Sequence, residues 1–64
     1  MSEVIMVPLS LADCGAIVVS LYETSEGYRR YGDVGSQQIC LRISDNIIAC
    51  LPGSEAKQLR ALRP

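Results

Sequence analysis

Apolar residues in the first half of the chain recur every three or four positions, as they do along one buried face of a helix. The residues on this stripe are Leu11, Cys14, Val18, Leu21 and Tyr22. Ser10, followed three residues later by Asp13, matches a capping box at a helix start, and Gly32 is a natural stop. We therefore expect a helix from Ser10 towards Gly32, although the β-branched run 16–22 would also suit a strand.

From Gln37 onward the pattern changes to alternation. The runs Gln38–Ile43 and Ile47–Leu51 flank Ser44-Asp45-Asn46, and Asp and Asn tolerate the backbone of a tight hairpin turn. Pairing the two runs across this turn places apolar side chains on one face: Ile39, Leu41, Ile43, Ile48 and Cys50. The sequence therefore predicts a β-hairpin here.

The two ends of the chain complete the expected fold. Glu3–Val7 has the composition of a short strand that ends at Pro8. Pro52-Gly53 precedes a final helix with Ser54 as the expected N-cap and an apolar seam of Ala56, Leu59 and Leu62. The prediction is one α+β domain over residues 1–64, a small antiparallel sheet packed with two helices in the order β-α-β-β-α.

The cysteine count and the absence of histidine limit the available chemistry. The chain has three cysteines, an odd number, and no histidine. It therefore lacks both a closed disulfide framework and the commonest zinc ligand sets, and we expect neither a metal nor a cofactor. Cys14, Cys40 and Cys50 lie among apolar neighbours, as free thiols do in a reducing compartment, so a cytoplasmic location is expected. The apolar runs are far shorter than the ~20 residues of a membrane span.

The amount of apolar surface is large for so short a chain. Hydrophobic residues make up 48% of the 64 positions, yet tryptophan and phenylalanine are absent. Chains of this size bury only about 60% of the surface that they expose when unfolded. Apolar patches that remain outside mark association surfaces, so we expect a homodimer.

No constellation of residues favours catalysis. Ser54 and Lys57 have the S-x-x-K spacing, but a capping serine followed by a solvated lysine is the commoner origin of this pattern. Cys40 with Arg42 fits packing on a sheet face better than thiolate activation. A small anion held at the start of the last helix, near Ser54, is a further and weaker hypothesis. We therefore predict that the protein is not an enzyme.

A cluster of tyrosines and arginines suggests binding. Tyr28, Arg29, Arg30 and Tyr31 precede Gly32 and Asp33, and Tyr and Arg are enriched at interface hot spots. The same rings and guanidinium planes could stack on bases, or the cluster could simply be a helix end. We interpret Tyr28, Arg29, Arg30, Tyr31 and Asp33 as a site for a larger protein partner.

The alternative partner is nucleic acid. Its contacts would come from Arg42 and from a basic stripe that recurs every three residues on the last helix, namely Lys57, Arg60 and Arg63. The net charge of −1 provides no general attraction to a polyanion. The sequence therefore favours a small inhibitor or modulator of a larger host protein, of the kind common among phage and mobile-element accessory proteins, over a dimeric nucleic-acid-binding regulator.

Overall fold

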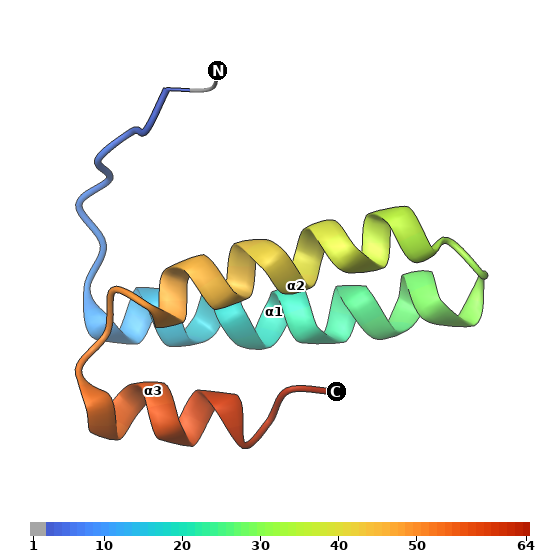
Figure 1. The fold of residues 1–64 in the computed structure, drawn as a ribbon. Helices are drawn as coiled ribbons and strands as arrows, with labels where there is room; N and C mark the ends of the chain where they lie inside the picture. Colours follow the sequence, from blue (N-terminus) through green and yellow to red (C-terminus); the bar gives the residue numbers. More distant parts are fainter. Residues whose placement is uncertain (1–2) are drawn as a thin grey trace.

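The computed structural model describes residues 3–64, and this part of the chain is helical without any strand. Three helices follow one another: α1 (Leu11–Arg30), α2 (Val34–Ile48) and α3 (Gly53–Arg60). Figure 1 shows α1 and α2 as an antiparallel hairpin, with α3 packed along one side of it. The predicted α+β fold is therefore wrong, and no antiparallel sheet forms within residues 3–64.

Helix α1 forms where the sequence predicts it. The Ser10 hydroxyl accepts a hydrogen bond from the Asp13 backbone N–H at 3.1 Å, and the Asp13 carboxylate accepts one from the Ser10 N–H at 3.2 Å. This capping box satisfies two backbone donors at the helix start. The stop at Gly32 is also confirmed, since Gly32 adopts a left-handed φ of 76° just beyond the helix. The strand alternative for residues 16–22 is excluded.

Helix α2 replaces the predicted β-hairpin, including the turn at Ser44-Asp45-Asn46. The run that looked alternating is short, and over the whole segment the buried positions follow helical spacing: Cys40, Leu41, Ser44 and Ile48. Ser44 is buried, and its hydroxyl donates to the Cys40 carbonyl oxygen at 2.9 Å, one helical turn back. A tight hairpin turn also favours a glycine, which Asp45-Asn46 does not supply. Asp33, which the sequence suggests as a partner contact, caps the start of α2.

The two ends of the chain differ from the prediction in smaller ways. Residues 3–9, which we call the arm, run extended from the start of α1 but pair with no other strand in the described chain. The last helix, α3, starts at Gly53 with Pro52 in the N-cap position and no capping side chain. Ser54 is therefore not the N-cap, and its hydroxyl donates instead to Glu55 at 2.6 Å.

The core lies where α3 meets the α1–α2 hairpin. Its buried side chains come from all three helices: Val18, Tyr22, Leu41, Ile48 and Ala56. Of the expected seam on α3, Ala56 is buried and Leu59 packs beside the core, whereas Leu62 is 61% exposed. The core therefore closes one side of the hairpin and leaves the other side open.

Candidate functional site

The turn between α1 and α2 has a rigid backbone. The Asp33 N–H donates to the Tyr28 carbonyl oxygen at 2.9 Å, and the Gly32 N–H donates to the Arg29 carbonyl oxygen at 3.1 Å. These two bonds, with Gly32 in the left-handed region, form a Schellman motif. Because Asp33 then caps α2 directly, only residues 31–33 link the two helices.

This turn brings the predicted partner-binding residues together at one end of the molecule, which we call the hairpin tip (residues 28–33). Tyr31 is 90% exposed, and Tyr28, Arg29 and Arg30 are exposed beside it. The Arg29 guanidinium donates to the Glu26 carboxylate at 2.7 Å, which raises the pKa of Arg29 and lowers the pKa of Glu26. Within residues 3–64, Arg30 forms no ion pair, although its charge lies near enough to Glu26 to help lower the pKa of that carboxyl.

Asp33, the fifth predicted contact, has a structural role. One carboxylate oxygen accepts from the Ser36 backbone N–H at 3.0 Å, and the other accepts from the Ser36 hydroxyl at 2.8 Å. These hydrogen bonds hold the pKa of Asp33 below its ordinary value. The carboxylate therefore fixes the turn that presents Tyr31 and Arg30.

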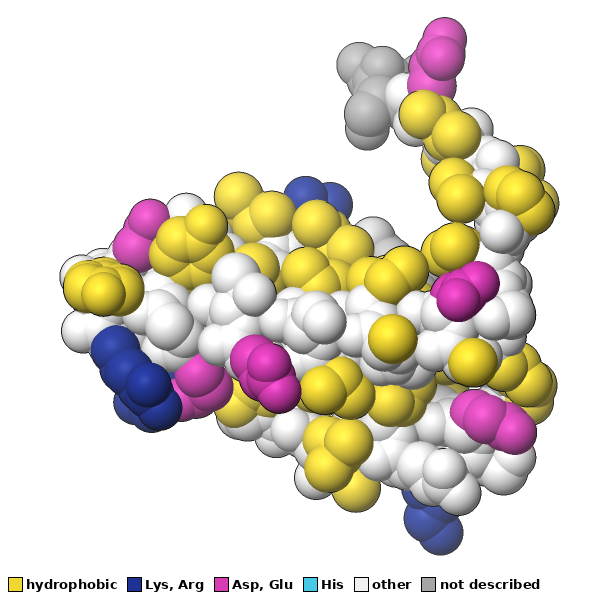
Figure 2. Space-filling model, turned by 180° about the vertical axis from the view of Figure 1, so that it is seen from behind, with side chains coloured by type: hydrophobic (Ala, Val, Ile, Leu, Met, Phe, Trp, Pro, Cys, Tyr) yellow, Lys and Arg dark blue, Asp and Glu magenta, His cyan; other side chains and the backbone are white. Residues whose placement is uncertain are grey.

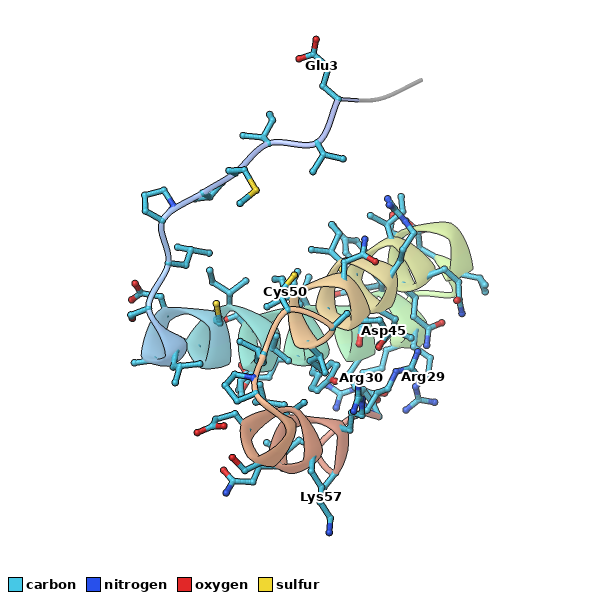
Figure 3. The ribbon with its side chains drawn as sticks, turned by 60° about the vertical axis from the view of Figure 1, so that its left-hand side comes forward. Glu3, Arg29, Arg30, Asp45, Cys50 and Lys57 are labelled. Atoms are coloured by element: carbon cyan, nitrogen blue, oxygen red, sulfur yellow. The ribbon has the colours of Figure 1, made fainter. Side chains whose placement is uncertain are left out.

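The basic residues suggested for nucleic acid do not form one outward-facing stripe. Arg63 donates to Asp45 of α2 at 3.3 and 3.4 Å. Both Arg63 and Arg60 lie near enough to Tyr22 to lower its pKa, against the larger raising effects of burial and of Asp45. Lys57 points away from the other two helices (Figure 3), and Arg42 belongs to α2.

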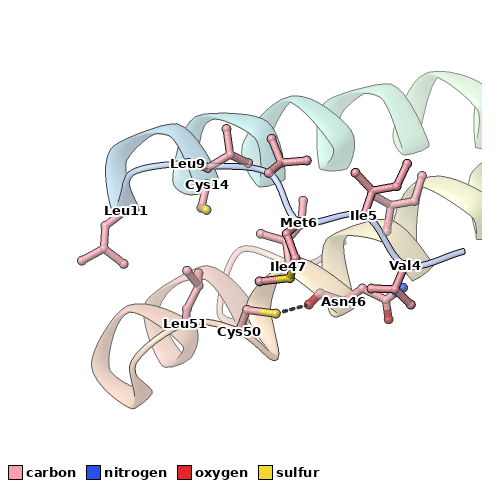
Figure 4. A pocket seen from close by; sticks show the side chains of 12 residues that line it. Val4, Ile5, Met6, Leu9, Leu11, Cys14, Asn46, Ile47, Cys50 and Leu51 are labelled. Atoms are coloured by element: carbon pink, nitrogen blue, oxygen red, sulfur yellow. Dashed lines mark hydrogen bonds between the residues drawn. The ribbon is translucent and has the colours of Figure 1, made fainter.

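A second candidate site, which the sequence analysis did not identify, is an open cleft of about 560 Å³ between the arm and the hairpin. We call it the arm cleft (Figure 4). One wall is the arm and the first residue of α1, through Val4, Ile5, Met6, Val7, Leu9 and Leu11. The other wall comes from the hairpin and the segment after α2, through Cys14, Ile43, Asn46, Ile47, Cys50 and Leu51. Among these described residues none carries a charge.

The arm cleft continues along α2. Ile39, Ile43 and Ile47 are spaced four residues apart, so they share one side of the helix. Ile39 is 51% exposed and Ile43 is 38% exposed. Figure 2 shows hydrophobic side chains gathered along the arm and along the hairpin beside it. The hairpin beside the arm therefore carries a row of apolar side chains that extends the cleft along α2.

Neither the thiols nor the other reactive side chains of the described residues form a cluster with an evident chemical role. Cys14, Cys40 and Cys50 are free thiols, and the Cys50 thiol donates to the Asn46 carbonyl oxygen at 3.5 Å. Within residues 3–64 no cluster of side chains could hold a metal ion, and no helix is long and apolar enough to cross a membrane. At the start of α3 the Ser54 hydroxyl donates to the Glu55 carboxylate. Because this negative charge lies beside Ser54, binding of a small anion there is disfavoured. Comparisons with protein families, with curated proteins and with solved structures found no match to this chain.

Proposed function

We propose that the protein is a non-catalytic interaction module that binds a larger protein through the hairpin tip and thereby modulates or inhibits it. The observation that carries this proposal is Tyr31, whose side chain is 90% exposed at the end of a rigid turn. A large aromatic side chain held in solvent is available for insertion into a partner's pocket, and Tyr and Arg are the residue types that dominate binding hot spots.

The geometry of the tip supports high affinity from a small area. The Schellman hydrogen bonds and the Asp33 cap fix the backbone before binding, so little conformational entropy remains to be lost. Tyr28 and Tyr31 supply apolar contact area with a hydroxyl at its end. Because Glu26 pairs with Arg29 while Arg30 forms no ion pair within residues 3–64, the partner surface is expected to combine an apolar pocket with a carboxylate at its edge.

The free thiols support a reducing compartment, so we place this activity in the cytoplasm. A module of this size would act by occupying a surface on its target. Nucleic acid is the less favoured partner, because Arg63 forms an ion pair with Asp45 and Lys57 points away from the other two helices.

The test is affinity capture from a lysate of the source cells, followed by titration of the purified chain against the identified partner. Tyr31→Ala and Arg30→Ala should each weaken binding by roughly tenfold to thirtyfold, as truncation of a hot-spot residue does. Neither variant should change the helical circular dichroism, because both side chains are exposed and make no hydrogen bond within residues 3–64.

Lys57→Ala is the matched control, because this exposed side chain lies on α3 away from the tip. It should bind like the parent chain. Unchanged affinity in both tip variants would refute the assignment. Recovery of nucleic acid that salt releases, with a loss in Lys57→Ala, would instead support the regulator hypothesis.

A further inference from the structure

The arm has the properties of a strand without a partner. Val4 is 92% exposed and Met6 is 90% exposed, although both are apolar. The backbone of residues 3–9 takes part in no backbone–backbone hydrogen bond within the described chain. β-Branched residues in extended conformation with free backbone groups are suited to pairing with a second strand.

The total exposed surface area also indicates that part of the surface is covered by a partner. A compact monomer of 7.0 kDa is expected to expose about 4,000 Å². This chain exposes 4843 Å². The excess of about 800 Å² equals the area that one partner contributes to a stable interface of standard size. The surplus surface is thus large enough for a specific dimer.

We propose that the arm cleft binds the arm of a second copy of this chain, exchanged reciprocally in a two-fold symmetric dimer. The chain's own arm forms one wall of the cleft and leaves it open, so a further segment is needed to fill it. That segment must be uncharged and apolar, as residues 4–9 are. A two-fold axis would place the arm of each copy in the cleft of the other copy. The two arms would then run antiparallel, so their backbones could pair.

This arrangement goes beyond the proposed function and does not depend on it. The arm lies at one end of the hairpin and the hairpin tip lies at the other (Figure 1). The dimer would therefore leave both tips free and present two copies of Tyr31 and Arg30. Loss of partner binding and loss of dimerisation can then be measured separately.

The first experiment measures solution mass by light scattering at about 100 μM. The parent chain should have about 14 kDa, twice its 7.0 kDa monomer mass. Ile43→Glu and Met6→Glu should each give the monomer mass, because they place a carboxylate in an uncharged interface. Val19→Glu is the matched control: Val19 is 37% exposed against 38% for Ile43 but does not line the cleft, so this variant should remain dimeric.

The second experiment tests exchange itself. Chains carrying Met6→Cys, Cys14→Ser and Cys50→Ser are mixed with ¹⁵N-labelled parent chains and oxidised with diamide. Mass spectrometry should find a disulfide between the introduced thiol of the unlabelled chain and Cys14 or Cys50 of the labelled chain. Both native thiols line the cleft, which makes them reporters of an arm seated there.

Three outcomes would overturn the proposal. The first is a monomer mass for the parent chain. The second is a dimer that persists after removal of residues 1–7. The third is an oxidised mixture in which the introduced thiol forms no disulfide with Cys14 or Cys50 of the labelled chain. Tyr31→Ala should leave the mass at about 14 kDa. If the parent chain is a monomer and Tyr31→Ala nevertheless abolishes partner binding, the dimer is refuted while the proposed function stands.

Discussion

Two serines occupy positions in the core that a chain usually fills with apolar residues. Ser25 and Ser44 are both 0% exposed, and each hydroxyl donates to a backbone carbonyl oxygen of its own helix, at 2.7 Å and 2.9 Å respectively. This back-bonding satisfies the hydroxyl without any partner from another helix. Their small volume lets α1 and α2 approach each other closely.

Asp33 makes folding stability depend on pH. Hydrogen bonds from Ser36 hold the pKa of Asp33 below its ordinary value of 3.8, so near that pH the unfolded chain binds the proton more readily than the folded chain. The contribution of this cap is therefore complete above about pH 5 and is lost as the pH falls through the folded-state pKa. In urea titrations at several pH values between 3 and 7, the urea concentration at half unfolding should be constant near neutral pH and should decrease when the pH is below 4.

Substitutions at the cap separate this effect from other acid sensitivity. Asp33→Asn keeps an accepting side chain at the N-cap but cannot titrate, so its midpoint should fall less steeply below pH 4 than that of the parent. Ser36→Ala removes the donating hydroxyl but leaves the backbone N–H, which is the larger cause of the pKa shift, and should give an intermediate slope. A slope in Asp33→Asn equal to that of the parent would contradict this account.

At the scale of the element, α1 and α3 begin in different ways. Ser10 and Asp13 form a reciprocal capping box on α1, whereas α3 begins at Pro52-Gly53 with no side-chain cap. Ser10→Ala should therefore lower the free energy of unfolding by about 1 kcal/mol, since it leaves a backbone donor of α1 without its partner. Ser54→Ala should change it by less than about 0.5 kcal/mol. Urea denaturation of the two variants gives both values, and equal losses would show that Ser54 caps α3 after all.

The sequence is sufficient to predict α1 because the local signals along this segment agree. A capping box, a helical apolar stripe and a stop glycine at a three-residue link all point to one helix. In α2 the signals conflict, because Gln38–Ile43 alternates over six residues while the burial of the whole element follows a helical period. A window that short does not distinguish a buried helix from a strand, and the burial that decides the question comes from α1 and α3.

The two candidate sites also differ in how far the sequence predicts them. The residues of the hairpin tip are neighbours in sequence, so any fold that ends a helix at Gly32 brings Tyr28, Arg30 and Tyr31 together. The arm cleft joins residues 4–14 to residues 43–51, which come together only because α2 runs back along α1. The sequence predicts surplus apolar surface, from which we expect a second copy, but it does not indicate where that surface lies.

At the scale of the whole molecule, the surplus surface connects folding with assembly. A chain of 64 residues buries a small core, and six hydrophobic residues of its described part are buried. The arm adds nothing to that core, since its apolar side chains are 43–92% exposed. If each arm fills the cleft of a second copy, the apolar area buried there stabilises both copies, and the dimer is more stable than two separate chains.

Coupling of this kind makes the melting temperature depend on concentration. For two chains of this length unfolding and dissociating together, a tenfold increase in concentration should raise Tm by roughly 5 °C. Removal of residues 1–7 leaves the helices and their core in place but deletes most of the arm, so the truncated chain should melt at a lower Tm that no longer varies with concentration. Circular dichroism melts from 5 to 500 μM would measure both. A parent chain whose Tm is constant over that range would mean that the arm's apolar residues stay in solvent, and the excess of surface would then lack a role in stability.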